Sequence, residues 1–108
     1  MTHRLVFSPE ALTQLTELYR YIANAASPSI AENYTQAILS HCEGLCVFPH
    51  IGTLREDIRP GLRITHHKKR TVIAYLVDGE QVSILGVFYG GQNHEAMLQE
   101  DADNGSLH

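Results

Sequence analysis

Two stretches near the N-terminus carry apolar residues at helical spacing. The first stretch follows a short segment, Arg4–Phe7, whose composition is typical of a strand. The apolar positions of the first stretch are Leu12, Leu15, Leu18, Tyr19 and Ile22. The apolar positions of the second stretch are Ile30, Tyr34, Ala37, Ile38, Cys42 and Leu45. Apolar residues three and four positions apart share one face of a helix, so the pattern predicts two amphipathic helices.

Each predicted helix is preceded by a serine–proline pair. Ser8 and Pro9 stand before the first helix, and Ser27 and Pro28 stand before the second. Serine is a favoured N-cap, and proline is favoured at the first helical position because its missing N–H would have no partner there. The second helix is expected to end near residues 49–52, which contain a proline and a glycine. The two helices should form a hairpin whose apolar faces need a common surface.

The second half of the chain has the pattern of strands. Residues 62–65 can form one strand, and residues 71–77 (TVIAYLV) are rich in β-branched side chains. Asp78 and Gly79 are typical of a two-residue hairpin turn. Residues 81–89 then return as the partner strand, with apolar side chains on both faces. Such a strand is expected to be central and covered on both sides.

The order strand, helix, helix, strand, strand, strand predicts an α+β fold with a helical hairpin packed on an antiparallel sheet. A short helical turn is expected over residues 94–99, after Gly90 and Gly91 end the last strand. One domain is expected over residues 1–99, and residues 100–108 are expected to form an acidic, disordered tail that the fold does not need. No run of about 18 apolar residues exists and the N-terminal apolar segment is too short for a signal peptide, which predicts a cytoplasmic protein.

Charge is distributed unevenly along the chain. The formal net charge is -4, which argues against a general nucleic-acid binder. Most of the lysines and arginines nevertheless fall within residues 55–70. They are Arg55, Arg59, Arg63, Lys68, Lys69 and Arg70. This concentration predicts a docking surface for an acidic polypeptide or a nucleic acid. The alternative is that these side chains are solvated or pair with nearby Glu56 and Asp57.

Cysteines and histidines do not indicate a metal site. Cys42 and Cys46 lie one helical turn apart, where a disulfide is geometrically poor, and we expect both to be small buried residues. Adjacent His66 and His67 would point to opposite faces of a strand, so with His94 they make a poor ligand set. We expect neither a metal nor a cofactor.

Several segments, taken in order, resemble toxins of the RelE/ParE superfamily and especially its ParE branch. Residues 7–11 (FSPEA), with Tyr19 and Tyr21, resemble the family's first helix, and residues 48–52 (FPHIG) resemble the turn after its second helix. Residues 57–63 (DIRPGLR) are the closest match and resemble the family's lead into the next strand. Residues 72–75 (VIAY) and 84–87 (ILGV) resemble its last two strands. The similarity covers residues 3–98.

The resemblance implies a RelE/ParE-like fold and the toxin component of a type II toxin–antitoxin module encoded by two genes. It implies a ParD-like cognate antitoxin that neutralises the toxin in a hetero-oligomer. It also implies growth inhibition through DNA gyrase, which is bound rather than chemically modified, without sequence-specific DNA binding. The residues expected to bind the target or the antitoxin are Arg59, Arg63, His67, Lys68, Lys69, Arg70, Tyr89 and His94.

Two other functions stay open at this stage. RelE-type relatives are ribosome-dependent mRNA endoribonucleases, which need a base, an acid and a cation for the phosphate. The candidates for those catalytic roles here are Arg63, Arg70, Tyr89 and His94. Residues 89–94 (YGGQNH) lack the arginine that the nuclease branch places after the last strand. The other possibility is an interaction module without toxicity.

Overall fold

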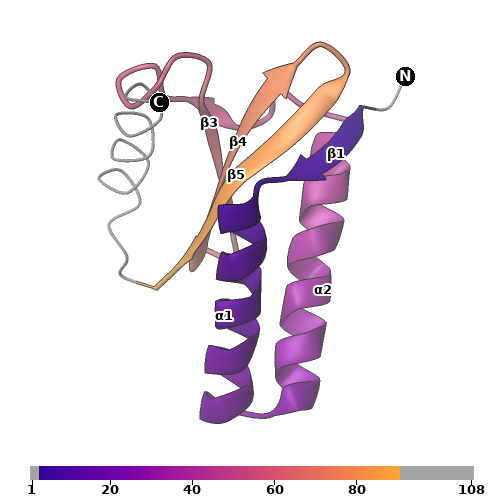
Figure 1. Ribbon diagram of the computed structural model, residues 1–108, viewed down its shortest axis with the longest axis vertical. Coiled ribbons are helices and arrows are strands. Elements are labelled where there is room, and N and C mark those ends of the chain that lie inside the picture. The colour runs from indigo at the N-terminus through magenta and orange to yellow at the C-terminus, as the bar shows by residue number, and fades with distance from the viewer. Residues whose placement is uncertain (1–2, 91–108) are drawn as a thin grey trace.

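The structure is a computed structural model that describes residues 3–90 (Figure 1). Its elements, in chain order, are β1 (Arg4–Phe7), α1 (Pro9–Ala25), α2 (Pro28–Leu45), β2 (Thr53–Leu54), β3 (Arg63–His67), β4 (Thr71–Asp78) and β5 (Gln81–Tyr89). In Figure 1 the two helices run side by side, and their joined ends project beyond the strands. The predicted helical turn, the predicted tail and His94 lie outside the described residues.

Both predicted helix starts are confirmed. The Ser8 side chain accepts a hydrogen bond from the Ala11 amide at 3.1 Å, and Ser27 does the same for the Ile30 amide at 3.1 Å. The Ser8 hydroxyl also donates to the Leu85 carbonyl at 3.1 Å. This serine therefore caps α1 and fixes its first turn against β5.

The sheet has five strands in the order β1-β5-β4-β3-β2. Strands β2 to β5 pair antiparallel as expected, but β1 pairs with β5 in parallel, so the sheet is mixed rather than wholly antiparallel. The parallel pairing goes with the position of α1, because β1 leads directly into this helix. The amide of Ser8, between β1 and α1, donates to the Ile84 carbonyl in the middle of β5. Strand β2 has two residues, too few for an alternating pattern to predict it.

Two details of the β4–β5 hairpin differ from the prediction or add to it. Asp78 pairs with Gln81, so the loop residues are Gly79 and Glu80, one position later than expected. Gly79 has φ +59°, which primed hairpin turns require at this position. The register also shifts between Ala74 and Tyr75. This bulge changes which residues of β5 face the helices.

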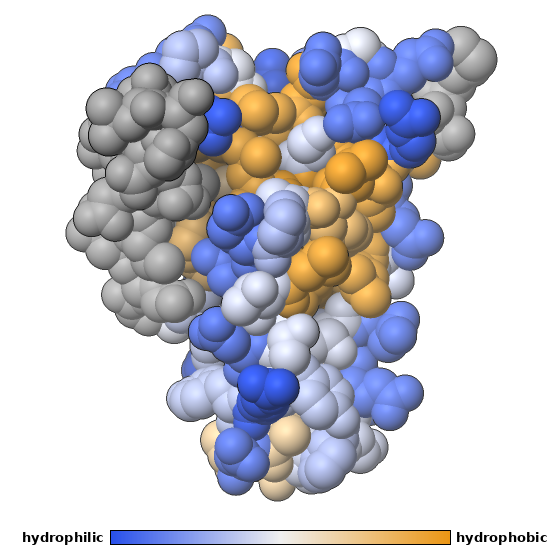
Figure 2. Space-filling model, in the orientation of Figure 1, coloured by the Kyte–Doolittle hydropathy of each residue, from blue (hydrophilic) through white to orange (hydrophobic). Residues whose placement is uncertain are grey.

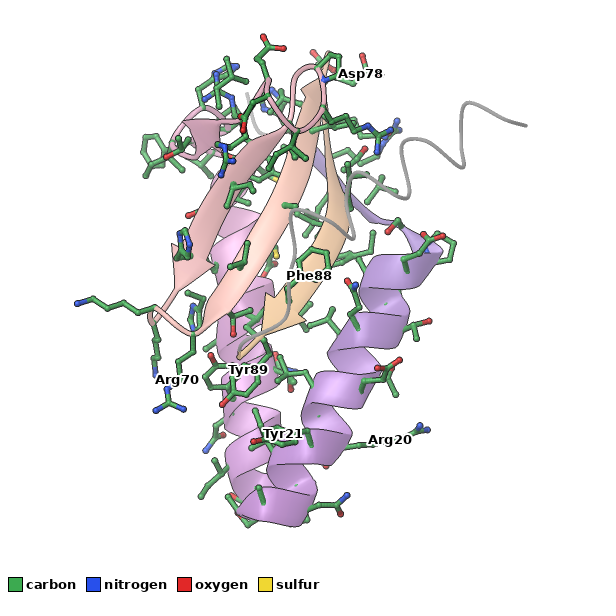
Figure 3. All side chains as sticks on the ribbon, turned by 90° about the vertical axis from the view of Figure 1, so that its left-hand side faces the viewer. Arg20, Tyr21, Arg70, Asp78, Phe88 and Tyr89 are labelled. Atoms are coloured by element: carbon green, nitrogen blue, oxygen red, sulfur yellow. The ribbon has the colours of Figure 1, made fainter. Side chains whose placement is uncertain are left out.

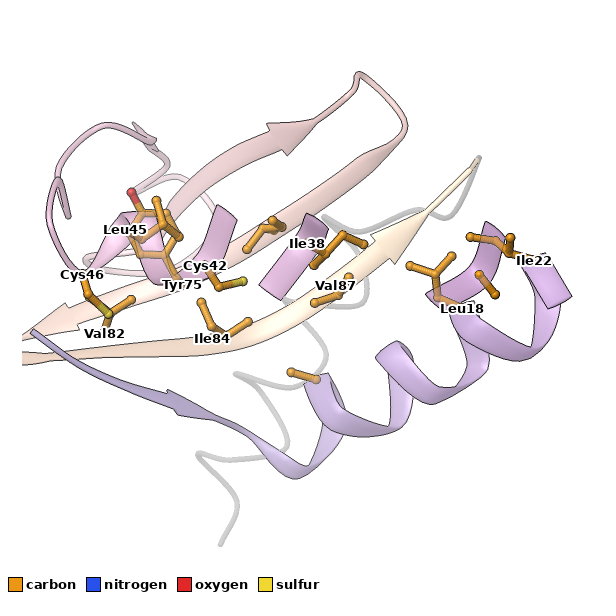
Figure 4. Close-up of a cluster of buried hydrophobic side chains, with 13 residues drawn as sticks. Leu18, Ile22, Ile38, Cys42, Leu45, Cys46, Tyr75, Val82, Ile84 and Val87 are labelled. Carbon is orange, nitrogen blue, oxygen red and sulfur yellow. The ribbon is translucent and has the colours of Figure 1, made fainter. Parts of the chain in front are cut away.

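Two apolar clusters cover the two faces of the sheet. The cluster between helices and sheet (Figure 4) consists of Ala11, Leu18, Ile22, Ala31, Ile38, Cys42, Leu45, Cys46, Ile73, Tyr75, Val82, Ile84 and Val87. The other consists of Ile58, Leu62, Ile64, Ala74 and Phe88. Members of the second cluster come from the β2–β3 loop as well as from the strands. Strand β5 is therefore central and covered on both faces, as predicted.

The cysteines behave as small core residues. Cys42 and Cys46 are free and buried, which confirms their predicted role. Burial raises the pKa of the Cys42 thiol to about 12, so it stays protonated and unreactive. Neither helix of residues 3–90 has the length and apolarity to cross a membrane.

Apolar side chains also reach the surface. Figure 2 shows them gathered on one face in the half of the molecule that holds the strands, while the projecting helix ends on that face are mostly polar. Val6 of β1 is 38% exposed and Leu12 of α1 is 53% exposed.

Candidate functional site

The basic residues predicted to bind a partner lie at the two ends of β3. Arg59 precedes the strand in a loop and Arg63 is its first residue, whereas Lys68, Lys69 and Arg70 follow its last residue. A strand of this length spans about 13 Å. These side chains therefore form two separate basic groups and not one continuous band.

Arg63 holds a loop in place. Its guanidinium donates to the Gly52 carbonyl at 2.8 Å and to the His50 carbonyl at 3.2 Å. The Tyr75 hydroxyl secures the same loop, because it donates to the Pro49 carbonyl and accepts from the Gly52 amide, both at 2.9 Å. Residues 48–52 and 57–63, which carry much of the family resemblance, are thus joined physically by Arg63.

Gly52 fits only because it lacks a side chain. A Cβ atom at this position would lie 2.6 Å from the Tyr75 hydroxyl and 3.1 Å from the Ile64 carbonyl oxygen. Burial raises the pKa of the Tyr75 phenol, so the hydroxyl keeps the proton that it donates to the loop. The close approach of loop, strand and ring makes this end of β3 a fixed structural unit.

Of the two acidic residues near these arginines, Asp57 pairs with another arginine and Glu56 accepts from a backbone amide. Arg55 forms a two-point contact with Asp57, with nitrogen–oxygen distances of 2.9 and 2.8 Å. Hydrogen bonds from Arg55 lower the pKa of the Asp57 carboxyl. The Glu56 carboxylate accepts from the Gly61 amide at 3.1 Å, where Gly61 has φ +76°. The acids shape the β2–β3 loop, and Arg63 is directed to backbone carbonyls instead.

Aromatic and cationic residues line a hollow at the other end of β3, which we call the tyrosine groove. Its volume is about 500 Å³, and its lining comes from α1, α2, the β3–β4 turn and the end of β5. The lining residues are Tyr21, Ile22, Ala25, Ala26, Ile30, Tyr34, Lys68, Arg70 and Tyr89. Figure 3 shows Tyr21 and Tyr89 close together, with Arg70 on the neighbouring turn. A second hollow of about 390 Å³ shares both tyrosines and continues along α1.

The rings of the groove are held in fixed relation. Tyr89 lies 5.6 Å from Tyr21 and 6.0 Å from Tyr34, measured between ring centroids. The Tyr34 hydroxyl is hydrogen-bonded to the buried Thr71 hydroxyl at 2.7 Å. Because Tyr89 pairs with Thr71 across the sheet, the structure brings the predicted residues Arg70 and Tyr89 together. Tyr21 is 59% exposed, so much of its ring remains accessible.

The turn between β3 and β4 has a strained backbone. Lys68 and Lys69 have φ values of 53° and 62°, and the Arg70 amide donates to the His67 carbonyl at 3.2 Å. Asparagine and glycine are the usual residues in such a turn, because a left-handed conformation costs other residues roughly 1 kcal/mol or more each. Strain of this kind concentrates at functional positions.

His67 lies behind the groove and not on its rim. Its Nδ1 is 3.3 Å from the Nδ1 of His41, and its ring meets Tyr34 edge-on at 5.4 Å. The two imidazole centroids are 5.5 Å apart, and the two Nδ1 atoms are within hydrogen-bonding distance of each other. The residues that the structure describes contain no cluster of three possible metal ligands.

Burial lowers the pKa of both histidines. For His67 the neighbouring His41 and Lys68 lower it further. The Nε2 of His67 is buried, and no hydrogen-bond partner for it exists among residues 3–90. His66, one residue earlier, is exposed, as expected for neighbours on a strand. The predicted binding residue His67 thus contacts Tyr34 and does not itself line the groove.

Of the residues that line the groove, the sequence predicts only Lys68, Arg70 and Tyr89 as binding residues. Tyr21 enters the prediction only through the family resemblance, and the helical spacing assigns Tyr34 and Ile30 to an apolar helix face. Tyr34 was correctly placed there, yet Ile30 is 53% exposed. The available signal was the position of Ile30 in the first turn of α2, beyond the edge of the sheet. His41 carried no signal of its own, since its partner is 26 residues away.

A third surface feature is an apolar patch beside the edge strand β2, which we call the apolar rim. Its members are Val47, Phe48, Ile51 and Leu54, with exposed fractions of 54, 67, 70 and 45%. Large apolar side chains so close in sequence, next to an open strand edge, are typical of protein-interaction surfaces. The rim lies near the Arg63 end of β3, since Leu54 pairs with Arg63.

Comparison with known proteins agrees with this architecture. The family model for the ParE toxin of the type II toxin–antitoxin system parDE matches residues 5–94. The chain is 33% identical over 84 residues to Toxin ParE3 of Caulobacter vibrioides, an alignment that covers 78% of this chain and 83% of that protein. A solved structure titled "Chromosomal ParDE TA system from P. aeruginosa" is 20% identical, with a TM-score of 0.72 over 82% of this chain and 97% of the other. The last likeness confirms the predicted RelE/ParE-like fold. The chain belongs to the ParE family of type II toxin–antitoxin toxins.

Proposed function

We propose that this toxin arrests growth in the cytoplasm by binding DNA gyrase, and that a cognate antitoxin neutralises it in a hetero-oligomer. Membership of the ParE family supports a toxin of this kind. The resemblance of the chain to ParE toxins supports gyrase as the target. Binding without chemistry is consistent with hollows that are open and shared among several elements.

The observation that carries binding over RNA cleavage is the position of Arg63. A nuclease would need a cation that is free to stabilise the charge on the phosphate. Arg63 instead donates to two backbone carbonyls of the α2–β2 loop. It also lies at the opposite end of β3 from Arg70 and Tyr89. The three described candidates for nuclease chemistry therefore do not converge on one phosphate.

The apolar rim supports a protein target. Phe48 and Ile51 are 67 and 70% exposed, and a partner that covered them would gain the free energy of burying apolar surface. The tyrosine groove lies at the other end of β3, so the chain presents two distinct surfaces. We assign the apolar rim to the target.

A gyrase supercoiling and cleavage assay with the purified toxin tests the proposal. We expect supercoiling to be lost and cleaved DNA to accumulate, and prior addition of the antitoxin to prevent both. Ile51→Ser should weaken inhibition roughly tenfold without unfolding the exposed loop. Thr16→Ala, on the exposed side of α1, is the matched control and should leave inhibition unchanged.

Gyrase that stays fully active in molar excess of folded toxin would contradict the proposal. Ribosome-dependent cleavage of mRNA would then be tested with the same preparation. Cleavage that is abolished by Arg70→Ala would assign the toxin to the nuclease branch.

A further inference from the structure

The tyrosine groove differs from the apolar rim in charge. Lys68 and Arg70 line the groove, Lys69 lies between them in the same exposed turn, and no acidic residue is part of the lining. Within residues 3–90, no carboxylate forms an ion pair with any of these three side chains. The apolar rim is more exposed but consists of uncharged side chains. The groove is therefore suited to an anionic partner, and the rim is not.

Aromatic rings lie beside these cations. Tyr21, Tyr34 and Tyr89 line the same hollow, and Tyr21 is the most accessible of them at 59% exposure. The rings of Tyr21 and Tyr89 are in contact, with centroids 5.6 Å apart and planes inclined by 55°. A ring that is already held in place loses less conformational freedom when a ligand packs on it. Proteins that bind single-stranded nucleic acids combine such rings, on which bases stack, with cations that contact the phosphates.

The backbone of the turn is an independent sign that the lysines are used. Lys68 and Lys69 have left-handed φ values of 53° and 62°, where asparagine and glycine would be more stable. Their side chains are exposed and contribute nothing to the core. Residues that reduce stability in this way are expected where a binding function needs their charge.

We propose that the tyrosine groove binds single-stranded DNA, with phosphates on the turn of residues 68–70 and a base stacked on Tyr21. The inference rests on the proposed function, because gyrase is where the toxin would meet cut DNA strands. The apolar rim holds the enzyme, and the groove at the other end of β3 contacts the DNA. A duplex fits the groove less well, since its bases are stacked on one another and offer Tyr21 no free face.

The net charge of the chain sets the strength of this contact. A charge of -4 repels an extended polyanion, so the groove alone binds DNA weakly. Once the rim is bound to gyrase, the effective concentration of DNA at the groove is high, and a weak contact becomes significant. The contact then prolongs the life of the cleaved complex. An antitoxin that shields the turn from DNA would remove it.

Anisotropy of a fluorescent thymidine strand of about 12 nucleotides, titrated with the purified toxin, tests the groove directly. We expect saturable binding at low salt. The logarithm of Kd should rise with the logarithm of the salt concentration with a slope of about 2, because three cations each release about 0.7 counterions from a single strand.

The first variant is Lys68→Asn/Lys69→Gly, which installs the residues that the turn prefers and removes both charges. We expect Kd to rise roughly tenfold at low salt and the salt slope to fall below about 1. The Tm should rise by about 5 °C, because the backbone strain is relieved. A raised Tm shows that the loss of affinity does not come from unfolding.

The second variant, Tyr21→Leu, removes the ring and keeps an apolar side chain. We expect Kd to rise roughly tenfold with an unchanged salt slope, because stacking is lost and the cations remain. Tyr21→Phe keeps the ring and should bind as the unmodified toxin does. Arg20→Gln is the matched control for charge, since Arg20 lies on α1 and points away from the groove (Figure 3). It should change Kd less than twofold.

Gyrase assays separate the inference from the proposed function. Lys68→Asn/Lys69→Gly should bind gyrase in the absence of DNA as the unmodified toxin does, but it should accumulate severalfold less cleaved DNA. Ile51→Ser, in the apolar rim, should weaken both. An unmodified toxin that binds the single strand but not gyrase would contradict the proposed function and leave the groove assignment intact.

Other outcomes overturn the inference. Folded toxin that shows no saturable binding of the single strand would do so, as would an equal loss of affinity in Arg20→Gln. Unchanged affinity in both groove variants would place the DNA elsewhere on the chain. Tighter binding of an RNA strand, or of a glutamate-rich peptide of similar length, would assign the groove to that partner instead.

Discussion

Arg63 and Lys68 are both basic residues that the sequence predicts to bind a partner. They lie at opposite ends of β3, and their surroundings differ. At the Arg63 end, a guanidinium and a tyrosine hydroxyl satisfy backbone groups of the α2–β2 loop. At the Lys68 end, two exposed lysines hold an unfavourable backbone conformation. Basic residues thus stabilise the fold at one end, whereas at the other end they reduce its stability through their backbone conformation.

The comparison shows what decides the role of a basic side chain. An arginine beside unpaired carbonyls forms hydrogen bonds that the fold needs. A lysine in a strained, exposed turn gives the fold nothing, which points to a role in binding.

Gly52→Ala should have the largest effect, because the new Cβ would meet the Tyr75 hydroxyl at 2.6 Å. We expect the free energy of unfolding in urea to fall by about 3 kcal/mol as packing and the loop hydrogen bonds are disturbed. Gly44→Ala is the matched control, since a Cβ there meets nothing within 4 Å in α2. It should raise stability by about 0.5–1 kcal/mol. Equal losses at both positions would show that the Arg63 end is not specially fixed.

Arg63→Ala should lower the free energy of unfolding by about 2 kcal/mol, because two loop carbonyls lose their charged donor. Arg70→Ala, in the exposed turn, should change it by less than about 0.5 kcal/mol. Urea unfolding of the two variants measures the difference. If Arg70→Ala proves the more destabilising, the contrast between the two ends of β3 is wrong.

The smallest effect concerns pH and the pair His41 and His67. Burial lowers both pKa values below the ordinary 6.5. In the window between the lowered values and 6.5, the unfolded chain binds protons that the folded chain does not. Stability therefore declines as the pH falls below about 6.5 and stops declining below the folded-state pKa values. His41→Gln should flatten this decline in urea unfolding from pH 7.5 to 5; an unchanged slope would contradict the pairing.

Much of the fold could be predicted because its signals are local. The two Ser-Pro pairs, the helical spacing and the alternating strands concern residues that are close in sequence. The parallel pairing of β1 with β5 could not be read in this way, because it joins residues 77 positions apart, such as Arg4 and Gln81. The bulge opposite Tyr75 also could not be predicted, because an alternating pattern of apolar and polar residues does not show where the register shifts.

The site was less predictable than the fold. Arg70 and Tyr89 were found because one carries charge and the other matches a family pattern. The groove between them also needs Tyr21 and Tyr34, which arrive from two helices. The basic residues form two groups because β3 separates them, and Arg63 is held by carbonyls of the α2–β2 loop. Neither can be inferred from charge alone.

Hydrogen exchange of the toxin, free and bound to its antitoxin, tests whether the two ends of β3 have different roles. We expect new protection at Lys68, Lys69 and Arg70 and at the end of α1 on binding. We expect little change at Gly52, whose amide already donates to Tyr75. Protection confined to residues 50–63, with the β3–β4 turn as exposed as before, would contradict this expectation.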